Sequence, residues 1–395
     1  MSNGPNIKRD GLVFYYDVNN TKSYVGEPTT NLVNPSWSAW GIDASGYSTA
    51  GTRTIISPYH CRIDDIASNT RQSITMGGVN ENSIYTFSVK YRKIGGAPSL
   101  RFQIYSRVGG SYVQQEFPTT IQLGIIDTYE WQTATYNYTT PPGTDLFFWY
   151  MQDGNDYTPY THSFELKEPQ VEKKSHATTF VNGARSVTQS LLDMTRRTTI
   201  DLTLSSFDVN SYPVLDGTDD RIDLGNLSEY FPSGVPAVTV EQVFKITSGA
   251  SGPLAPLFEN YRFNLWYDYS TDTFSLNTRS GPPDTSGYQF AVGGSSTITC
   301  NPKGNYNHIV GVYETINTTQ GRVRLYVNGE FAGQYVDTKM GAYPIYPTWI
   351  GQSNHSGYGT YKLNGRVDLT KLYTLALTAN DVKQNYNALK HRFGL

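Results

Sequence analysis

The sequence predicts an all-β protein made of two β-sandwiches, one inserted into the other, with a short helix at the C-terminus. Only 16% of the 395 residues are charged, while 14% are aromatic and 31 are tyrosine. Tyr and Thr favour strands, and the abundant Asn and Gly favour tight turns. Period-two alternation of apolar and polar residues recurs along the chain, and a single helical pattern closes it.

The first strand-rich block runs over residues 31–172. Apolar and polar residues alternate through 85–93 (YTFSVKYRK) and again through 100–108 (LRFQIYSRV), which is typical of half-buried antiparallel strands. The length and strand spacing of the block fit a jelly-roll-like sandwich. Residues 167–183 are polar and charged, and we interpret them as a linker to the second block.

The second block contains two predicted hairpins. Asn328-Gly329 lies between VRLYV and EFAGQYV, and both residues tolerate the positive φ that a tight primed turn requires. Residues 266–276 (WYDYSTDTFSL) form the second hairpin. In 365–377 the apolar parity is interrupted by Lys371, for which we expect a β-bulge or a lysine that extends its ammonium to solvent.

A helix is predicted over 378–393. Thr378 occupies the N-cap position, and Asp381 stands three residues later to complete a capping box. One apolar face follows at helical spacing: Val382, Tyr386, Leu389 and Phe393. A solitary helix this short is marginal in water, so we expect it to cover the second block as a lid. The alternative is that the final KHRFGL anchors the chain in a neighbouring subunit.

The order of elements from GRVRLYVNGEFAGQYV through WIGQS to LNGRVDLTKLYTLALTANDVKQNYN resembles the concanavalin A-like, laminin G-like sandwich. LDGTDDRIDLG resembles a recurring strand of that family, and GLVFYYDVNNTKSY resembles its opening strand. The resemblance implies that residues 1–30 pair with residues 173–395, and that the block 31–172 is an insertion between them. Domain insertion succeeds at exposed loops, so this arrangement is physically reasonable.

The sequence is also similar to structural proteins of tailed bacteriophages, from GLVFYYDVNN through FVNGARSVTQSLLD to NYNALKHRFGL. This resemblance implies a non-enzymatic virion protein, made in the host cytoplasm and displayed on the particle as a capsid decoration, collar or fibre component. Its implied partners are other virion proteins (capsid, collar or tail) and further copies of itself in a homo-oligomer, with weak glycan binding. The alternative is a receptor-binding adhesin for host glycans, and a glycoside hydrolase is less favoured.

Several function classes lack their sequence signals. Glycoside hydrolases of this fold use a Glu-x-Asp-x-x-Glu strand that projects two carboxylates onto one face, and we find no such spacing. The six histidines are scattered without zinc-ligand spacing. The net charge of −3 does not favour nucleic acid, and no stretch has the apolar length of a membrane helix. We therefore expect no enzyme, no required cofactor and no membrane insertion, and we expect Cys61 and Cys300 to be free thiols of different blocks.

Three groups of residues are candidate sites. Calcium prefers carboxylate and carbonyl oxygens, which Asp216, Asp219 and Asp220 supply, although we favour an ordinary turn on Asp216-Gly217. The Gly-rich loop 353–362 carries His355, Tyr358 and Tyr361, where a sugar could stack; a plain flexible loop is the favoured alternative. In the first block, several aromatic residues form a second candidate platform, some of them expected in the core: Trp37, Trp40, Trp149, Tyr150, Tyr157 and Tyr160.

Overall fold

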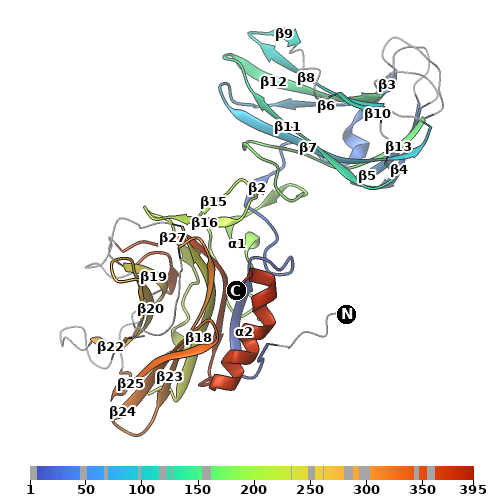
Figure 1. Cartoon of the computed structure of the whole chain (residues 1–395). Helices are drawn as coiled ribbons and strands as arrows, with labels where there is room; N and C mark the ends of the chain where they lie inside the picture. Colours follow the sequence, from blue (N-terminus) through green and yellow to red (C-terminus); the bar gives the residue numbers. More distant parts are fainter. Residues whose placement is uncertain are drawn as a thin grey trace. The chain divides into compact units, whose positions relative to one another are not determined.

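The structure is a computed structural model, and it describes residues 7–44, 51–65, 70–96, 99–114, 122–125, 128–153, 162–232, 234–247, 254–260, 262–279, 288–292, 303–341, 347–353 and 361–395. The chain forms two compact units. The inserted unit is Pro28–Arg185, and the split unit combines Met1–Glu27 with Ser186–Leu395. In Figure 1 the blue first strand of the split unit accordingly lies beside red elements from the end of the chain.

The inserted unit is a sandwich of two antiparallel sheets. One sheet has the order β10 (Gln122–Ile125), β8 (Ser99–Val108), β12 (Thr144–Asp153), β6 (Thr70–Gly77) and β3 (Gly41–Ala44), and β9 (Ser111–Gln114) also pairs with β8. The other has the order β11 (Gln132–Thr139), β7 (Ile84–Gly95), β13 (His162–Glu172), β5 (His60–Asp65) and β4 (Thr52–Ser57). Two further elements complete the unit: the pair β2 (Thr29–Thr30) with β14 (Ala184–Arg185), and the 3-10 turn η1 (Trp37–Ala39).

The boundary of the inserted unit differs from the predicted one. The predicted linker 167–183 is not free. Its first part, through Glu172, belongs to β13 (His162–Glu172), and its second part, 173–183, also belongs to the inserted unit. The reason is a buried carboxylate. Glu172 is fully buried and accepts hydrogen bonds from the backbone and hydroxyl of Thr178 (2.9 and 2.5 Å) and from the hydroxyl of Thr29 (2.5 Å). These polar residues therefore tie the segment down, because a buried carboxylate without such donors would be costly.

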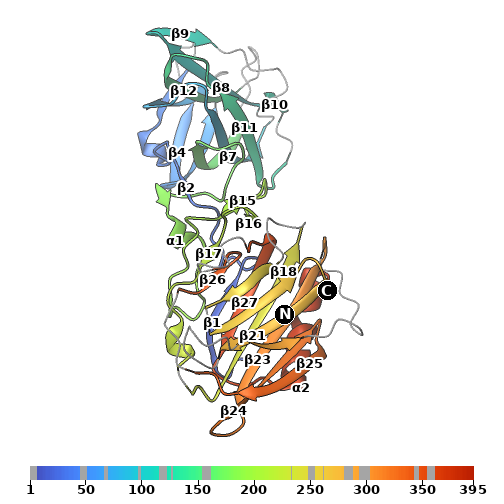
Figure 2. The ribbon, with the colours of Figure 1, turned by 90° about the vertical axis from the view of Figure 1, so that its left-hand side faces the viewer.

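The split unit is a larger sandwich. Its first sheet has the order β15 (Ser206–Phe207), β16 (Pro213–Asp216), β27 (Asn364–Tyr373), β18 (Ala237–Ile246), β23 (Tyr306–Thr315), β24 (Gln320–Val327) and β25 (Glu330–Thr338), and β1 (Leu12–Asp17) pairs with β27. Its second sheet has the order β17 (Ile222–Asp223), β26 (Trp349–Ile350), β19 (Leu254–Glu259), β20 (Phe263–Asp268), β21 (Thr273–Arg279) and β22 (Tyr288–Val292). The short helices are α1 (Val187–Ser190) and the 3-10 turn η3 (Ser228–Tyr230). Figure 2 shows strands of the first sheet passing behind β21 and β26.

The predicted hairpins of the split unit are confirmed. β24 and β25 are joined at Asn328 and Gly329, whose φ angles of 50° and 78° are the positive values of a primed turn. β20 and β21 pair in register over the second predicted hairpin. Apolar side chains between the two sheets, such as Leu265 and Leu276, form the largest core of the chain.

The predicted C-terminal helix is present as α2 (Ala379–Phe393) and packs on the outer face of the eight-stranded sheet (Figure 1). Thr378 and Asp381 form the capping box, and Gly394 ends the helix at a left-handed φ of 67°. Val382, Leu389 and Phe393 are at most 6% exposed, and they contact apolar residues of β18, β23 and β27. No helix within the described ranges is both long and apolar enough to cross a membrane.

Lys371 does not extend to solvent. It is fully buried beneath α2, and its Nζ lies 3.0 Å from Oε1 of Glu241, which is also fully buried. The neighbouring bulge is at Asp368 rather than at Lys371, because Val243 pairs with Leu369 and the next residue of β18 pairs with Val367. The prediction of a snorkelling lysine is therefore wrong, and a buried ion pair takes its place.

Candidate functional site

The six-stranded sheet of the split unit carries a row of polar and aromatic side chains on its outer face. Directly paired residues place five side chains side by side across five strands, and we call them the polar row: Asp223, Trp349, Glu259, Asn264 and Asn277. Paired residues of an antiparallel sheet project to the same face. Their chain neighbours Ile222, Leu265 and Leu276 project into the core, so the polar row faces away from it.

Glu259 is the centre of the polar row and is 1% exposed. Its Oε2 accepts a hydrogen bond from Trp266 Nε1 (3.1 Å), and its Oε1 accepts one from Ser353 Oγ (2.8 Å). Because Trp266 and Ser353 come from different elements, the carboxylate fixes an aromatic ring and the start of the 353–362 loop at one place. Tyr361, at the other end of that loop, meets the Trp266 ring edge to face at 6.1 Å between centroids.

Trp349 is the half-buried second member of the polar row, between Asp223 at its end and Glu259 at its centre. Its Nε1 donates to Asp223 Oδ2 (3.1 Å), which fixes the orientation of the indole. The guanidinium of Arg221 lies over the ring, 3.9 Å from its centroid, and donates to Gln352 Oε1 (3.4 Å). This cation–π contact holds an aromatic ring, a cation and an amide together at the rim of the sheet.

Asn277 is fully buried at the opposite end of the polar row. Its Nδ2 is 3.5 Å from Ser275 Oγ, whereas its Oδ1 has no hydrogen-bond partner among the described residues. A buried acceptor without a donor costs about 1–3 kcal/mol, so such groups call for an explanation. The orphaned oxygen lies at a fully buried residue, so it is not itself a contact point for a ligand.

The structure describes only one of the three residues predicted on the 353–362 loop. Tyr361 is half-buried against Trp266, as given above. His355 and Tyr358 lie outside the described residues. The described ends of this loop, Ser353 and Tyr361, both reach the polar row and its aromatic neighbour.

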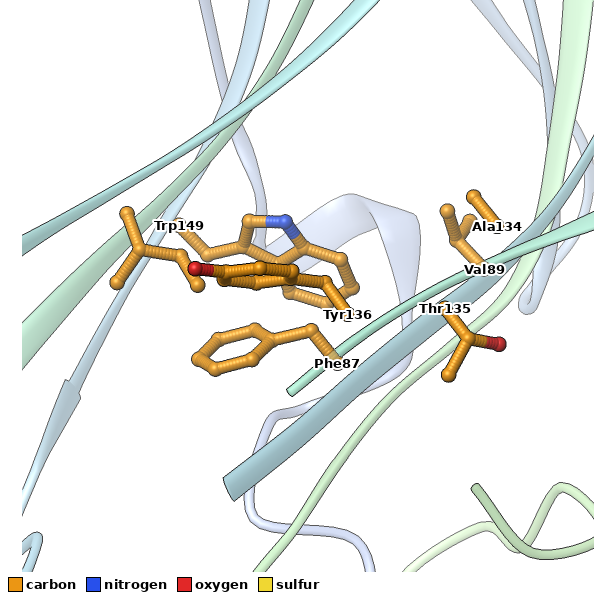
Figure 3. Close-up of a pocket in the computed structure, with 7 residues that line it drawn as sticks. Phe87, Val89, Ala134, Thr135, Tyr136 and Trp149 are labelled. Carbon is orange, nitrogen blue, oxygen red and sulfur yellow. The ribbon is translucent and has the colours of Figure 1, made fainter. Parts of the chain in front are cut away.

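The three tryptophans of the candidate aromatic platform in the inserted unit lie in the core, as expected for some members of that group. Trp37, Trp40 and Trp149 are 0–2% exposed and pack on one another edge to face or tilted inside the core. A buried ring cannot stack on a sugar, and these rings fill the space between the two sheets. Figure 3 shows Trp149 beside Phe87 and Tyr136 at a small apolar cavity of about 10 Å³, which is on the order of one water molecule. Tyr157 and Tyr160 lie outside the described residues.

The three predicted calcium ligands are brought together. Oxygen atoms of Asp216, Asp219 and Asp220 lie within 4.8 Å of one another. Turn hydrogen bonds already use two of the carboxylates: Asp216 Oδ1 accepts from Thr218 N (2.7 Å), and Asp220 Oδ2 accepts from Asp216 N (2.9 Å). Burial, with the Asp216 charge acting in the same direction, raises the pKa of Asp220. The donor set fits a divalent cation in chemistry, while its geometry is that of an Asx turn.

The sequence carried a signal for the polar row that went unused. In FNLWYD the polar or amphipathic Asn264 and Trp266 share one parity, and in TFSLNTR Ser275 and Asn277 do the same. This alternation indicates that one face of both strands is polar. The contribution of Trp349 and Asp223 had no local signal, because both lie in strands of two residues.

Comparison with known proteins places this geometry on a recognised fold. Residues 216–383 match the family described as the concanavalin A-like lectin/glucanases superfamily. With its short C-terminal helix, the split unit is thus a concanavalin A-like, laminin G-like sandwich. Curated protein sequences give no significant match to the chain.

Solved structures with a similar fold are distant. The leech intramolecular trans-sialidase is 17% identical with a TM-score of 0.33, covering 42% of this chain and 27% of the leech chain. The CBM40 module of the Ruminococcus gnavus IT-sialidase, bound to α2,3-sialyllactose, is 14% identical with a TM-score of 0.31, covering 40% and 89%. The enzymatically active domain of tailspike protein 4 of bacteriophage CBA120 is 10% identical with a TM-score of 0.29, covering 36% and 21%. At these values the three structures assign neither a ligand nor an activity to this chain.

Proposed function

We propose that the split unit is a non-enzymatic glycan-binding module, that the half-buried Trp349 and Tyr361 contact the glycan, and that the buried members of the polar row hold this face in place. The observation that carries this proposal is the unbroken polar row on the outer face of the sheet. A sheet that only completed a core would not need buried carboxylates and amides on its far side, because each of them must find a partner.

Sugar chemistry suits this surface. Sugars present apolar CH faces that stack on aromatic rings, and hydroxyls that both donate and accept hydrogen bonds. Trp349 and Tyr361 are the half-buried aromatic side chains at this face, and Arg221 supplies donors beside Trp349. We therefore place contact with the glycan at Trp349 and Tyr361, and Glu259 supports Tyr361 from behind through its hydrogen bond to Trp266.

A glycan array probed with the full chain tests the proposal. Selective binding is expected, and Trp349→Ala and Tyr361→Ala should each weaken it about tenfold or more, since each removes a stacking ring worth on the order of 1–2 kcal/mol. Tyr335→Ala is the matched control, because Tyr335 is 45% exposed on β25 of the other sheet. Equal binding by all three variants, or no binding by the wild-type chain, would contradict the proposed site.

A second proposal concerns where the module acts: we propose that the chain is a surface component of a bacteriophage particle. The supporting observation is that the first of the segments similar to phage structural proteins (11–20) contacts the end of the second (180–193) and the third (385–395) within the split unit. Tyr15 N donates to Asp193 Oδ1 (3.0 Å), and Arg392 Nη2 lies 2.6 Å from Asp17 Oδ2. The segments of similar sequence thus contact one another in the folded chain, rather than being short matches at unrelated places.

Mass spectrometry of purified particles, with a copy number, tests this placement. Hundreds of copies would indicate capsid decoration, and a few copies would indicate a collar or fibre. Absence of the chain from particles would exclude the virion role while leaving glycan binding by the isolated chain unaffected.

A further inference from the structure

The split unit contains a second cavity, built from residues outside the polar row. Its walls come from Lys22 and from the segment 188–200, and its volume of about 480 Å³ falls within the range of small-molecule sites, roughly 300–1,000 Å³. Every residue that lines it is described and belongs to the split unit. The cavity is therefore formed by the split unit alone.

The floor of the cavity is apolar. Leu191 and Ile200 line it and are also members of the main core, where each is at most 1% exposed. Leu192 lines the same cavity and is 39% exposed. A ligand with an apolar body would remove this surface from water.

The charge of the cavity is positive. Lys22 and Arg196 line it, both are exposed, and neither has an ion-pair partner among the described residues. Asp193 is the single carboxylate among the lining residues, and it is occupied. Its oxygens accept hydrogen bonds from the backbone N–H groups of Tyr15 (3.0 Å), Thr195 (2.9 Å) and Arg197 (2.9 Å). The two cations therefore keep their charge available, whereas the carboxylate is held by backbone donors.

The backbone at Arg196 is fixed in an unusual conformation. Its φ of 61° is in the left-handed region that non-glycine residues rarely adopt, and its N–H donates to Asp193 O (2.9 Å). Such a residue persists where the surrounding structure over-determines it, and these residues cluster at ligand sites. The hydrogen bonds to Asp193 supply that constraint, so the point from which the Arg196 side chain leaves the backbone is fixed.

We propose that this cavity binds a small organic anion, with a carboxylate placed between Lys22 and Arg196 and an apolar body on Leu191, Leu192 and Ile200. A single exposed cation is normally solvated. Here two unpaired cations border one cavity with an apolar floor, and one of them is on a constrained backbone. The proposal does not depend on glycan binding at the polar row.

The test compares phenylacetate with its neutral analogue phenylacetamide, by isothermal titration against the full chain. The two probes share one apolar body, so the difference isolates the charge. Phenylacetate should bind at least about tenfold more tightly, since hydrogen bonds to charged groups exceed neutral ones by that order. Equal affinity of the two probes, or no binding of phenylacetate up to about 10 mM, would overturn the proposal.

Variants locate the site. Arg196→Asn removes the cation but keeps a residue that tolerates left-handed φ, and Lys22→Gln removes the other cation. Each should weaken phenylacetate about tenfold without changing the melting temperature. Arg9→Gln is the control, because Arg9 is exposed on the same unit and does not line the cavity. Wild-type affinity in the double variant Arg196→Asn/Lys22→Gln would show that the anion binds elsewhere and would end the proposal.

Discussion

Replacing Glu241 by Gln should destabilise the split unit strongly, because this carboxylate is the centre of a buried cluster beneath α2. Its Oε1 lies 3.0 Å from both Lys371 Nζ and His308 Nε2. Its Oε2 accepts from Tyr373 OH (3.0 Å) and Asn385 Nδ2 (2.7 Å). All five side chains belong to fully buried residues, so water cannot replace a lost partner.

The pKa of Glu241 gives the sign of the effect, and the cost of breaking a buried ion pair gives its size. Burial alone would raise the pKa of Glu241, but the Lys371 charge and the His308 contact outweigh it and lower the pKa to about 2. Burial lowers the pKa of the partner Lys371, so the gain at Glu241 is partly offset at the lysine, and the pKa of Glu241 gives the sign of the effect only. Removing one partner of a buried ion pair costs about 3–5 kcal/mol. We therefore expect Glu241→Gln to lose about 3–5 kcal/mol.

The pH dependence has a defined sign. A carboxyl group whose pKa is lower in the folded state stabilises the fold above its unfolded pKa, and this stabilisation is lost as pH falls toward the folded pKa. The wild-type chain should therefore lose stability from Glu241 between about pH 4.5 and pH 2, and Glu241→Gln should lack that part of the loss.

Denaturant unfolding of the split-unit transition, repeated between pH 7 and pH 2, measures both effects. Glu330→Gln is the matched control, because Glu330 pairs with Lys383 at an exposed site and such pairs contribute at most about 1 kcal/mol. The double variant Glu241→Gln/Lys371→Met should recover most of the loss, since no lone charge stays buried. A Glu241→Gln chain as stable as the wild type, or a double variant as unstable as the single one, would refute the reasoning.

Three further predictions follow from the fold. Phe393→Ala should lower the free energy of unfolding of the isolated chain by about 3–5 kcal/mol. Phe331→Ala is the control and should lower it little, because Phe331 is 52% exposed. If Phe393→Ala melts like wild type but no longer joins particles, the helix is an anchor and not a lid. A fragment of residues 28–185 should show a cooperative melt alone, and the shorter 31–172 should melt lower because it lacks the β2–β14 pair; an unfolded 28–185 fragment would exclude an independent unit. If the cluster of Asp216, Asp219 and Asp220 binds calcium, added calcium should raise the melting temperature of the wild-type chain but not that of Asp219→Asn. An increase of the same size in Asp219→Asn would mean that calcium binds elsewhere.

Local patterns predicted the local elements well. Alternating strands, the Asn328-Gly329 turn and the capping box at Thr378 each depend on residues within a few positions of one another, and all are present. The apolar face of α2 was also predicted from spacing alone. Asn385 was missed on that face because its partners, Glu241 and the Tyr373 hydroxyl, come from strands far away in the chain.

The same limit explains the misassigned residues. At Lys371 the sequence indicates a β-bulge or an ammonium that reaches solvent, because the actual partner, Glu241, is 130 residues away and leaves no local signal. Trp149 lies in a stretch that is apolar on both faces, so periodicity could not tell which side faces the core. The polar row is the reverse case. Its parity is visible in β20 and β21, but only strand pairing joins Asn264 and Asn277 to Glu259 and Trp349.

The two sheets of the split unit differ at their outer faces, and this difference suggests a structural role for one face and a binding role for the other. The eight-stranded sheet buries its outer face under α2, where Phe393 and Leu389 contact strand residues. The polar row of the six-stranded sheet includes a half-buried aromatic side chain, Trp349. If α2 is a lid and the polar row a binding surface, the two functions should separate by mutation.

Phe393→Ala should lower the melting temperature and, well below that temperature, leave glycan affinity unchanged. Trp349→Ala should lose glycan affinity while melting close to wild type, since the ring is at the rim. Two variants that lose stability and binding together would mean that the polar row is part of the core, and glycan recognition would then have to be sought elsewhere on the chain.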